Sequence, residues 1–312
     1  MLIFSFIISC AKKTECSDCD TSVVESKDSA IVSDSGVTEQ PDSVEPIDTG
    51  EWPEGNWVAI SAGGWHSCAV RSDHSISCWG RNLEGQTDAP TNKPFRDVTA
   101  GNRFSCGLEL DSTVSCWGEH PDYDPQLRFL SIHAGRDYVC GLLPDGSISC
   151  WGNNDKGQCD APQGEFISLT AGRSHACAIS ADNLVQCWGD NSFLQTQPTE
   201  GLYTDIAAGF YHTCAVDTEN SVHCWGKDIE GSTETPLVKA TTVYAGNYHT
   251  CIINLTEQGI CWGGDIYGLS GGLIGTKFRL LALGGFHTCG VSLEGELFCT
   301  GDNNQGQTDF PE

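Results

Sequence analysis

The sequence contains little positive charge. It has 16 Lys and Arg against 42 Asp and Glu in 312 residues, a formal net charge of -26. Such a chain is repelled by the phosphates of nucleic acid and by anionic headgroups, so we expect no nucleic acid partner. It also lacks an apolar run of the roughly 20 residues that a membrane-spanning helix needs. Met occurs once, whereas 36 Gly favour many tight turns and therefore an all-β fold.

Motifs that carry chemistry are also scarce. We find no His-Glu-x-x-His pair, no phosphate-binding loop and no cysteine set apart as a nucleophile. The sequence therefore predicts a protein that is not an enzyme, with no catalytic residue, no metal site and no cofactor.

Residues 1–10 form a short apolar stretch that ends at Cys10. The tetrapeptide Ile7-Ile8-Ser9-Cys10 is typical of the lipobox before a lipidated cysteine, so Cys10 is the predicted lipidation site. The stretch has no positive charge before the apolar run, which leaves open a start site further upstream and an ordinary cleaved signal peptide.

Residues 11–50 carry ten acidic residues, three Lys and no aromatic residue, a net charge of -7. A segment of this composition cannot bury enough apolar surface to offset its ordering entropy, and we interpret it as a disordered acidic tether. Cys16 and Cys19 lie within it. No second Cys or His pair is nearby, so a local disulfide or a lipoprotein flank is favoured over a metal or redox element.

From residue 51 to 312 the chain repeats. Six segments share the pattern Ala-Gly, two variable residues, an aromatic or His position, two cysteines and Trp-Gly, and a seventh follows it with Leu283 in place of Ala and Thr300 in place of Trp. They are residues 62–80, 100–118, 134–152, 171–189, 208–226, 245–263 and 284–301. The first cysteines are separated by 38, 34, 37, 37, 37 and 38 residues. A period this regular is typical of a solenoid or a propeller.

The two cysteines of every repeat lie ten positions apart. If residue i opposes residue i+10 in a hairpin, then i+2 opposes i+8, and these positions are aliphatic on both strands in six of the seven repeats, as in Val70 and Ile76. Opposed residues lie within disulfide range. We therefore predict seven disulfides rather than seven pairs of reduced core residues: Cys68–Cys78, Cys106–Cys116, Cys140–Cys150, Cys177–Cys187, Cys214–Cys224, Cys251–Cys261 and Cys289–Cys299.

A third strand precedes each hairpin, as in Trp57-Val58-Ala59-Ile60. Repeats of about 37 residues have room for three antiparallel strands that bury their faces only against neighbouring repeats. No capping repeat of different character stands at either end, which favours closure into a ring. The predicted fold is a seven-bladed β-propeller with one disulfide in each blade. The sequence does not reveal which strand closes the ring.

The recurring phrase AG, two variable residues, His-Ser/Thr, CAV or CGV, a turn and WG resembles the repeat of the regulator of chromosome condensation family over residues 57–312. The short repeats are similar to those of bacterial members, including the propeller-type beta-lactamase inhibitory protein. The resemblance implies seven blades and binding through one face of the disc. The family founder is an exchange factor for a small GTPase that also binds chromatin, but no insertion suits a GTPase and the acidic charge disfavours chromatin.

Three groups of residues at equivalent positions suggest sites but are interpreted as structural. A ring of five histidines could bind metal, yet symmetry spreads them around a disc, and Phe104 and Tyr138 replace them in two blades. The Trp residues after the second cysteines are expected to pack between blades, with Thr300 in the last. The Asn82/Gln86, Asn154/Gln158 and Asn303/Gln307 loops could suggest calcium, but turn-stabilising hydrogen bonds are favoured. The five histidines are His66, His175, His212, His249 and His287.

The two variable positions of the Ala-Gly loop are the candidate partner-binding site. Each loop has the same place in its blade, so these residues should form a circle around the channel mouth. Exposed aromatics and arginines in this arrangement are typical of a protein-binding hot spot, although they could equally be tolerated loop residues. The candidates are Trp65, Arg103, Arg136, Asp137, Arg173, Phe210, Tyr211, Tyr248 and Phe286.

The sequence thus predicts a monomeric binding module in the cell envelope, held to the membrane only through Cys10, or else secreted, that recognises an unidentified protein as an inhibitor or a receptor. A propeller enzyme, a lyase or a glycan hydrolase with its site at the channel mouth, and an exchange factor are the alternatives.

Cys159 lies outside the repeat pattern. It is either free or paired with Cys16 or Cys19.

Overall fold

The computed structural model describes residues 56–311, except 266, 270–272 and 274. Every regular element in this part of the chain is a β-strand, which confirms the all-β prediction. No helix among these residues has the length and apolarity to cross a bilayer. The predicted segments 1–10 and 11–50, with Cys10, Cys16 and Cys19, lie outside the described residues. The propeller belongs to the compact unit Thr49–Glu312.

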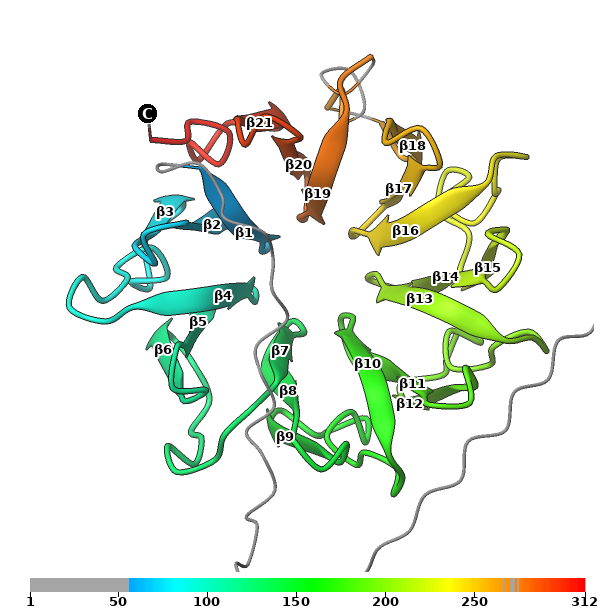
Figure 1. Ribbon diagram of the computed structural model, residues 1–312, viewed down its shortest axis with the longest axis horizontal. Helices are drawn as coiled ribbons and strands as arrows, with labels where there is room; N and C mark the ends of the chain where they lie inside the picture. Colours follow the sequence, from blue (N-terminus) through cyan, green and yellow to red (C-terminus); the bar gives the residue numbers. More distant parts are fainter. Residues whose placement is uncertain (1–55, 266, 270–272, 274, 312) are drawn as a thin grey trace, which may run out of the picture. The chain divides into compact units, whose positions relative to one another are not determined.

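Seven blades of three strands follow one another along the chain (Figure 1). Their strands are β1 (Trp57–Ala62), β2 (His66–Arg71), β3 (Ile76–Gly80); β4 (Phe95–Ala100), β5 (Phe104–Glu109), β6 (Val114–Gly118); β7 (Ser131–Ala134), β8 (Tyr138–Leu142), β9 (Ile148–Gly152); β10 (Phe166–Ala171), β11 (His175–Ser180), β12 (Val185–Gly189); β13 (Tyr203–Ala208), β14 (His212–Asp217), β15 (Val222–Gly226); β16 (Ala240–Ala245), β17 (His249–Asn254), β18 (Gly259–Gly263); β19 (Phe278–Leu283), β20 (His287–Ser292), β21 (Leu297–Gly301).

Within each blade the first strand lies at the central channel and the third at the rim (Figure 1). All strand pairs are antiparallel. In the first blade Cys68 pairs with Cys78 and Val70 with Ile76, and the same register recurs in the other six blades, for example between Cys177 and Cys187. The i, i+10 spacing therefore predicted the hairpin register correctly.

All seven predicted disulfides are present, one in each blade, with Cα–Cα distances of 4.0 to 4.1 Å. They lie between blades rather than at the rim. Cys68, Val70 and the partner Cys78 pack against Phe95 and Val98 of the next blade. Each bridge therefore closes a short loop and also contributes to the apolar surface that joins two blades.

Seven apolar clusters fill the seven contacts between blades. The tryptophans take part from the opposite face of the sheet, as predicted: Trp79 packs against Cys289 and Val291 of the last blade, and Trp225 against Cys177 and Ile179. The cluster that contains Trp79 joins the last blade to the first, so the ring closes.

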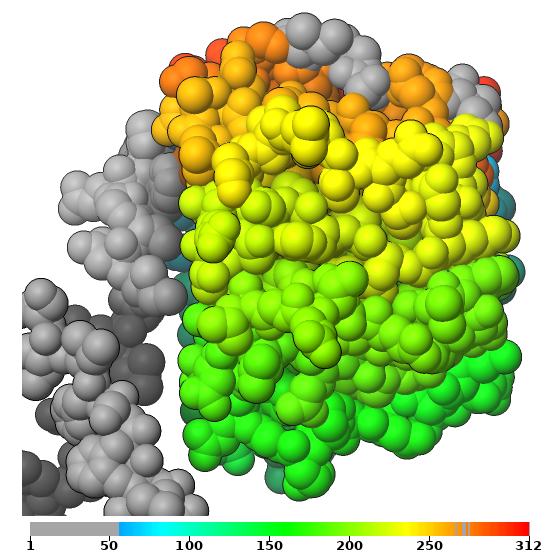
Figure 2. Space-filling model, turned by 90° about the vertical axis from the view of Figure 1, so that its right-hand side faces the viewer, coloured from blue at the N-terminus to red at the C-terminus, as the bar shows by residue number. Residues whose placement is uncertain are grey.

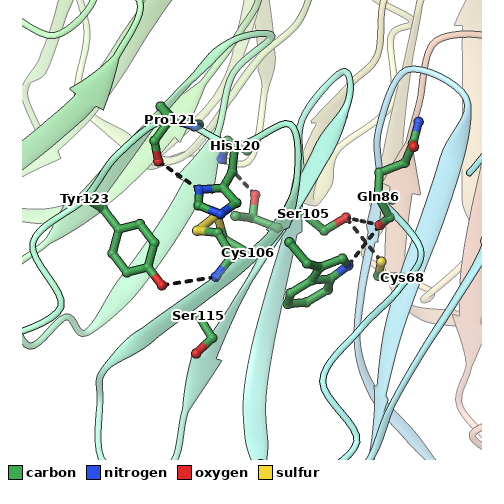
Figure 3. Close-up of a disulfide and its surroundings, with 12 residues drawn as sticks. Cys68, Gln86, Ser105, Cys106, Ser115, His120, Pro121 and Tyr123 are labelled. Atoms are coloured by element: carbon green, nitrogen blue, oxygen red, sulfur yellow. Dashed lines mark hydrogen bonds between the residues drawn. A yellow bond between two sulfur atoms is a disulfide. The ribbon is translucent and has the colours of Figure 1, made fainter. Parts of the chain in front are cut away.

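Most of these tryptophans also donate a hydrogen bond to the preceding blade. The indole Nε1 of Trp117 donates to the Gln86 carbonyl oxygen at 2.9 Å, which also accepts the hydroxyl of Ser105 at 3.1 Å (Figure 3). Across the closure, Trp79 Nε1 donates to the carbonyl of Gln307, 228 residues away, at 2.9 Å. Among the strands of residues 57–301 none is exchanged between blades, because each sheet consists of three consecutive strands. The ring is sealed by side chains and loops.

Three types of connection alternate along the chain. The inner loops join first to second strands, the hairpin turns join second to third strands, and the outer loops follow third strands. Each outer loop starts beside an inner loop, as where Arg81 N donates to the Trp65 carbonyl at 3.0 Å. Inner and outer loops therefore share one end of the disc, which we call the loop face, and the hairpin turns lie at the opposite end. Figure 2 shows consecutive blades as bands lying directly against one another around the rim.

Candidate functional site

The five ring histidines form hydrogen bonds between blades. The Nε2 atom of each lies 2.7 to 2.9 Å from a Ser or Thr hydroxyl of the next blade, as in His212 and Thr250. That hydroxyl donates to an outer-loop carbonyl, that of Ser232, at 2.9 Å, so it accepts the proton of Nε2. The remaining pairs are His66–Ser105, His175–Thr213, His249–Thr288 and His287–Ser67. The structural interpretation of these histidines is confirmed.

Burial keeps these imidazoles neutral. It lowers the pKa of His66, His175 and His249 to about 3 and the pKa of His212 and His287 to about 4. Since water is removed from around each ring, the charged form is disfavoured. No group of three or more His, Cys, Asp and Glu side chains within the described residues could hold a metal ion.

The two exceptions in this ring are matched by their neighbours. Phe104 stands where five blades have His, and the next blade has Val139 in place of the hydroxyl; both are buried in one cluster. Tyr138 precedes a blade that has Ala176 there, and its longer side chain donates to the His175 carbonyl at 2.5 Å. The side chain at each ring position is therefore complementary to the residue of the following blade.

A closed circle of backbone hydrogen bonds holds the inner loops. In each loop the N–H of the first variable residue donates to a carbonyl of the next blade, at 3.0 to 3.4 Å, and the bond from Gly285 to Gly63 completes the circle. The preceding glycine allows this approach, since a Cβ on Gly63 would lie 2.3 Å from the Gly101 oxygen. The variable residues are thus fixed around the channel mouth on a rigid frame.

Aromatic side chains of consecutive blades touch one another on this frame. Ring centroids are separated by 4.9 Å between Trp65 and Phe286, 5.4 Å between Phe286 and Tyr248, and 6.0 Å between Tyr248 and Phe210. Tyr211 continues the series at 4.6 Å from Phe210, and Phe193 lies 5.1 Å from Tyr211. We call these six residues the aromatic arc. The first five are half-buried and Phe193 is 37% exposed.

Two aromatic residues of this surface were not predicted from the sequence. Phe193 and Tyr267 come from outer loops, and Tyr267 lies 5.5 Å from Phe286 with 46% of its surface exposed. Both occupy the same position after their Trp-Gly pair, where the aligned loops have Glu84, Lys156 and Gln305. An aromatic residue at an otherwise polar loop position was the available signal.

The predicted arginines lie beside the arc. Arg173 stacks 4.3 Å above the Phe210 ring and donates to the Tyr211 hydroxyl, while Arg103 and Arg136 are exposed and pair with Glu119 and Asp137 at 3.1 and 3.3 Å. Burial, and secondarily the neighbouring Arg136, lower the pKa of Arg173. The exposed ion pairs of Arg103 and Arg136 contribute little stability. The guanidinium groups of these two residues are therefore available to other acceptors.

A cavity of about 560 Å³ lies in the channel, lined by the first strands and by inner-loop residues. Of the arc and the arginines, Phe210, Arg136 and Arg173 line it, together with Asn102 and Asn247. His133 and Asp205 are among the titratable groups that line it on the first strands. Burial lowers the pKa of His133 to about 4 and raises the pKa of Asp205 to about 6. Asp205 is engaged in the fold, since its carboxylate accepts the Val243 N–H at 2.8 Å.

The Asn and Gln side chains of the outer loops stabilise turns, as predicted. Asn82 donates to Asp88 at 2.7 Å and accepts the Thr87 N–H at 3.0 Å, and Gln86 accepts the Glu84 N–H at 3.0 Å. The loops of Asn154/Gln158 and Asn303/Gln307 repeat these bonds.

Cys159 is a free thiol in the described part of the chain. Burial, with Asp160 nearby, raises the pKa of this thiol to about 11, which disfavours the nucleophilic thiolate.

One short motif match was missed from the sequence. Residues 268–272 read Gly-x-Ser-x-Gly, but they fall between strands β18 and β19, whereas the esterase motif needs a strand-to-helix turn. Residues 270–272 lie outside the described residues.

Comparison with known families supports the repeat assignment. The family model for the regulator of chromosome condensation (RCC1) repeat matches five times, at residues 57–86, 129–158, 166–195, 203–231 and 278–307. The chain belongs to the RCC1 repeat family. Comparison with curated protein sequences finds no match.

Solved structures share the fold. The chain is 30% identical to the CRINKLY WD40 ectodomain of the Arabidopsis thaliana receptor kinase ACR4, with a TM-score of 0.65. The match covers 79% of the present chain and 96% of the ectodomain. It is 26% identical to the ectodomain of the Physcomitrella patens receptor kinase CR4, with a TM-score of 0.67, covering 78% and 72%. Prp20p of Saccharomyces cerevisiae is 16% identical, with a TM-score of 0.62 over 72% and 80%.

Proposed function

We propose that this RCC1 repeat propeller is a non-enzymatic extracytoplasmic binding module that recognises a protein through its loop face. The aromatic arc carries the proposal. Six touching aromatic side chains on consecutive blades form one surface that belongs neither to the inter-blade core nor to the repeating hydrogen bonds. Half-exposed aromatics of this kind are enriched at the centres of protein interfaces.

The frame beneath the arc supports tight binding. The circle of hydrogen bonds between inner loops and the histidine layer below it fix the backbone that carries the rings. Aromatic side chains have few rotatable bonds, and contacts between them restrict these further. Little entropy is therefore lost when a partner docks.

The chemistry of the partner follows from the two sectors of the face. Apolar side chains suit the arc between Trp65 and Phe193. Carboxylates or carbonyl oxygens suit Arg136 and Arg173 at its edge, because guanidinium groups bind planar acceptors through paired donors. We infer a partner whose epitope combines an apolar centre with acidic residues on one side.

Seven disulfides support a location outside the cytoplasm, where such bonds persist. The two plant relatives at 26% and 30% identity are ectodomains of receptor kinases, which also favours this location. Together with the predicted lipid attachment at Cys10, these observations support a propeller tethered at the cell envelope. We propose that it is a monomer and that it acts as an inhibitor or a receptor.

Capture experiments test the proposal. The full chain and a variant with Trp65, Tyr211, Tyr248 and Phe286 replaced by Ala are used to retain proteins from native envelope, and the retained proteins are identified by mass spectrometry. A control variant replaces the exposed Leu110, Leu184 and Leu255 of the hairpin turns by Ser. The proposal expects a protein that the wild type and the control retain and the arc variant loses. Equal retention by all three would refute the loop face as the binding surface.

A further inference from the structure

The two variable positions of the inner loops have different surroundings. In the part of the chain that the structure describes, the second residues do not line the channel cavity, whereas the first residues of six loops do. We call the seven first residues the inner circle: Gly64, Asn102, Arg136, Arg173, Phe210, Asn247 and Gly285. None of them is acidic, in a chain with 42 Asp and Glu against 16 Lys and Arg. The inner circle therefore presents hydrogen-bond donors and positive charge at the channel mouth.

Two arginines of the inner circle lie side by side on the third and fourth blades. The N–H of Arg136 donates to the Arg173 carbonyl at 3.4 Å, and both side chains line the cavity. Arg136 contributes, after burial, to lowering the pKa of Arg173. Within the described residues Arg136 pairs only with the exposed Asp137, at 3.3 Å, and Arg173 forms no ion pair. Two neighbouring positive charges with so little compensation favour an anion between them.

The donors around this pair are oriented and available. Arg173 is held by its stacking on Phe210, at 4.3 Å, and by one hydrogen bond to the Tyr211 hydroxyl. Its other N–H groups form no hydrogen bond within residues 56–311 as described. The side-chain amides of Asn102 and Asn247, which also line the cavity, have no hydrogen-bond partner in the same part of the chain. A guanidinium group fixed in this way loses little entropy when it binds a carboxylate.

We propose that the channel mouth receives the carboxyl end of the protein partner and that this end is an Asp or a Glu. The inference rests on the proposed function, since it places the acidic side of the partner's epitope. An Asp or Glu end carries two carboxylates, one for each guanidinium group, and each can accept paired N–H donors. The amides of Asn102 and Asn247 supply further donors to the bound end.

The shape of the site favours a chain end over a loop. The seven inner loops form a closed circle around the mouth, and the first strands converge on the centre of the ring below it (Figure 1). A chain end passes this circle once, whereas a loop needs room for two segments. The cavity of about 560 Å³ is within the range of about 300–1,000 Å³ that is typical of sites for small ligands.

Calorimetric titration of the full wild-type chain with the peptide acetyl-Gly-Ser-Gly-Asp, which has a free carboxyl end, tests the site. We expect saturable binding. Amidation of the end, or Asn in place of the peptide's Asp, removes one carboxylate and should weaken binding about tenfold. Acetyl-Gly-Asp-Asp-Gly-amide has the same two charges and no free end. Equal affinity for this peptide, or no binding of the first one, would overturn the proposal.

Variants of the chain locate the binding. Arg136→Gln leaves the arc intact and should weaken binding of acetyl-Gly-Ser-Gly-Asp about tenfold. Arg173→Lys keeps the charge, loses the paired donors and should also weaken it. Lys156→Gln is the matched control, because it removes an exposed positive charge from an outer loop of the same face that does not line the cavity; its affinity should equal that of the wild type. Unchanged affinity of Arg136→Gln would contradict the assignment.

Capture from native envelope separates this inference from the proposed function. A protein that the wild type retains and the arc variant loses supports the function, and the inference then expects that protein to end in Asp or Glu. Treatment of the captured protein with a carboxypeptidase should abolish its retention. A partner that ends in another residue, or that is retained after this treatment, would refute the inference and leave the proposed function standing.

Discussion

His287 and Ser67 are 220 residues apart in sequence, yet the Nε2 atom of His287 lies 2.7 Å from the Ser67 hydroxyl. This is the same contact that His212 makes with Thr250 inside the ring. The closure between the last and first blades therefore uses the ordinary inter-blade bond and needs no special strand. Because the bond is the same in both places, its contribution to the free energy of unfolding can be measured at the pair of His212 and Thr250.

Replacing Thr250 by Val should lower the free energy of unfolding by about 1–3 kcal/mol, because the buried His212 Nε2 proton loses its acceptor. The double variant His212→Phe with Thr250→Val reproduces the natural pair of Phe104 and Val139 and should recover part of this loss. Urea unfolding of both single variants and the double variant gives the coupling free energy. Strictly additive losses would mean that the two side chains act independently.

Stability should fall as the pH is lowered from neutral. Six histidines, the five of the ring and His133, have a pKa lowered to about 3 or 4 by burial. In the unfolded chain they take up protons near pH 6.5, so their contribution is fully present above about pH 6.5 and is lost as the pH falls toward these folded values.

Two aspartates act in the opposite direction. Burial raises the pKa of Asp97 and Asp205 to about 6, so their contribution is present below about pH 3.8 and is lost as the pH rises through 6. Because six groups outweigh two, unfolding free energy should rise with pH between about 4 and 6. Urea unfolding at several pH values measures this slope, which should be shallower in the His212→Phe, Thr250→Val variant. A flat profile would show that these imidazoles are protonated in the folded state.

Much of the fold was readable from the sequence because the repeat constrains it sevenfold. The i, i+10 cysteines fixed the hairpin register, and alternation placed Val70 beside Cys68 and Trp79 on the opposite face. The contacts between blades are also visible in the sequence. The residue two before the first cysteine of one repeat contacts the residue one before the first cysteine of the next, and these pairs are His–Ser, Phe–Val, Tyr–Ala and His–Thr. That comparison requires knowledge that equivalent positions of adjacent blades are neighbours.

The candidate surface was predicted less completely. Equivalence by symmetry placed Trp65, Tyr248 and Phe286 around the channel mouth, and the structure shows that they touch. Symmetry could not place Phe193 and Tyr267, because the reach of an outer loop depends on its own turn geometry.

The glycine of each Trp-Gly pair allows the outer loop to leave beside the inner loop. Gly226 has a φ of +102°, and a Cβ there would lie 2.6 Å from the Tyr211 oxygen. Gly226→Ala should therefore lower the midpoint of thermal unfolding. Gly231→Ala, at a φ of +81° with the nearest atom 3.6 Å away, experiences the backbone strain without the clash and should have a smaller effect. Equal shifts would assign the cost to φ alone.

The bridge between Cys177 and Cys187 should contribute stability mainly by restricting the unfolded chain. Replacing both residues by Ala opens a loop of ten residues, so we expect the free energy of unfolding to fall by about 3 kcal/mol. Part of any further loss arises from the contact of these sulfurs with Tyr203 and Ile206 in the adjoining blade. Cys159→Ala removes a cysteine that forms no bridge within the described residues, and it is the control that should shift the urea midpoint less than the double variant does. Peptide mapping of the unreduced wild type should recover the first cysteine of each repeat linked to the one ten residues later, from Cys68–Cys78 to Cys289–Cys299. Bridges between different blades would contradict both the pairing and the stabilising role assigned to it.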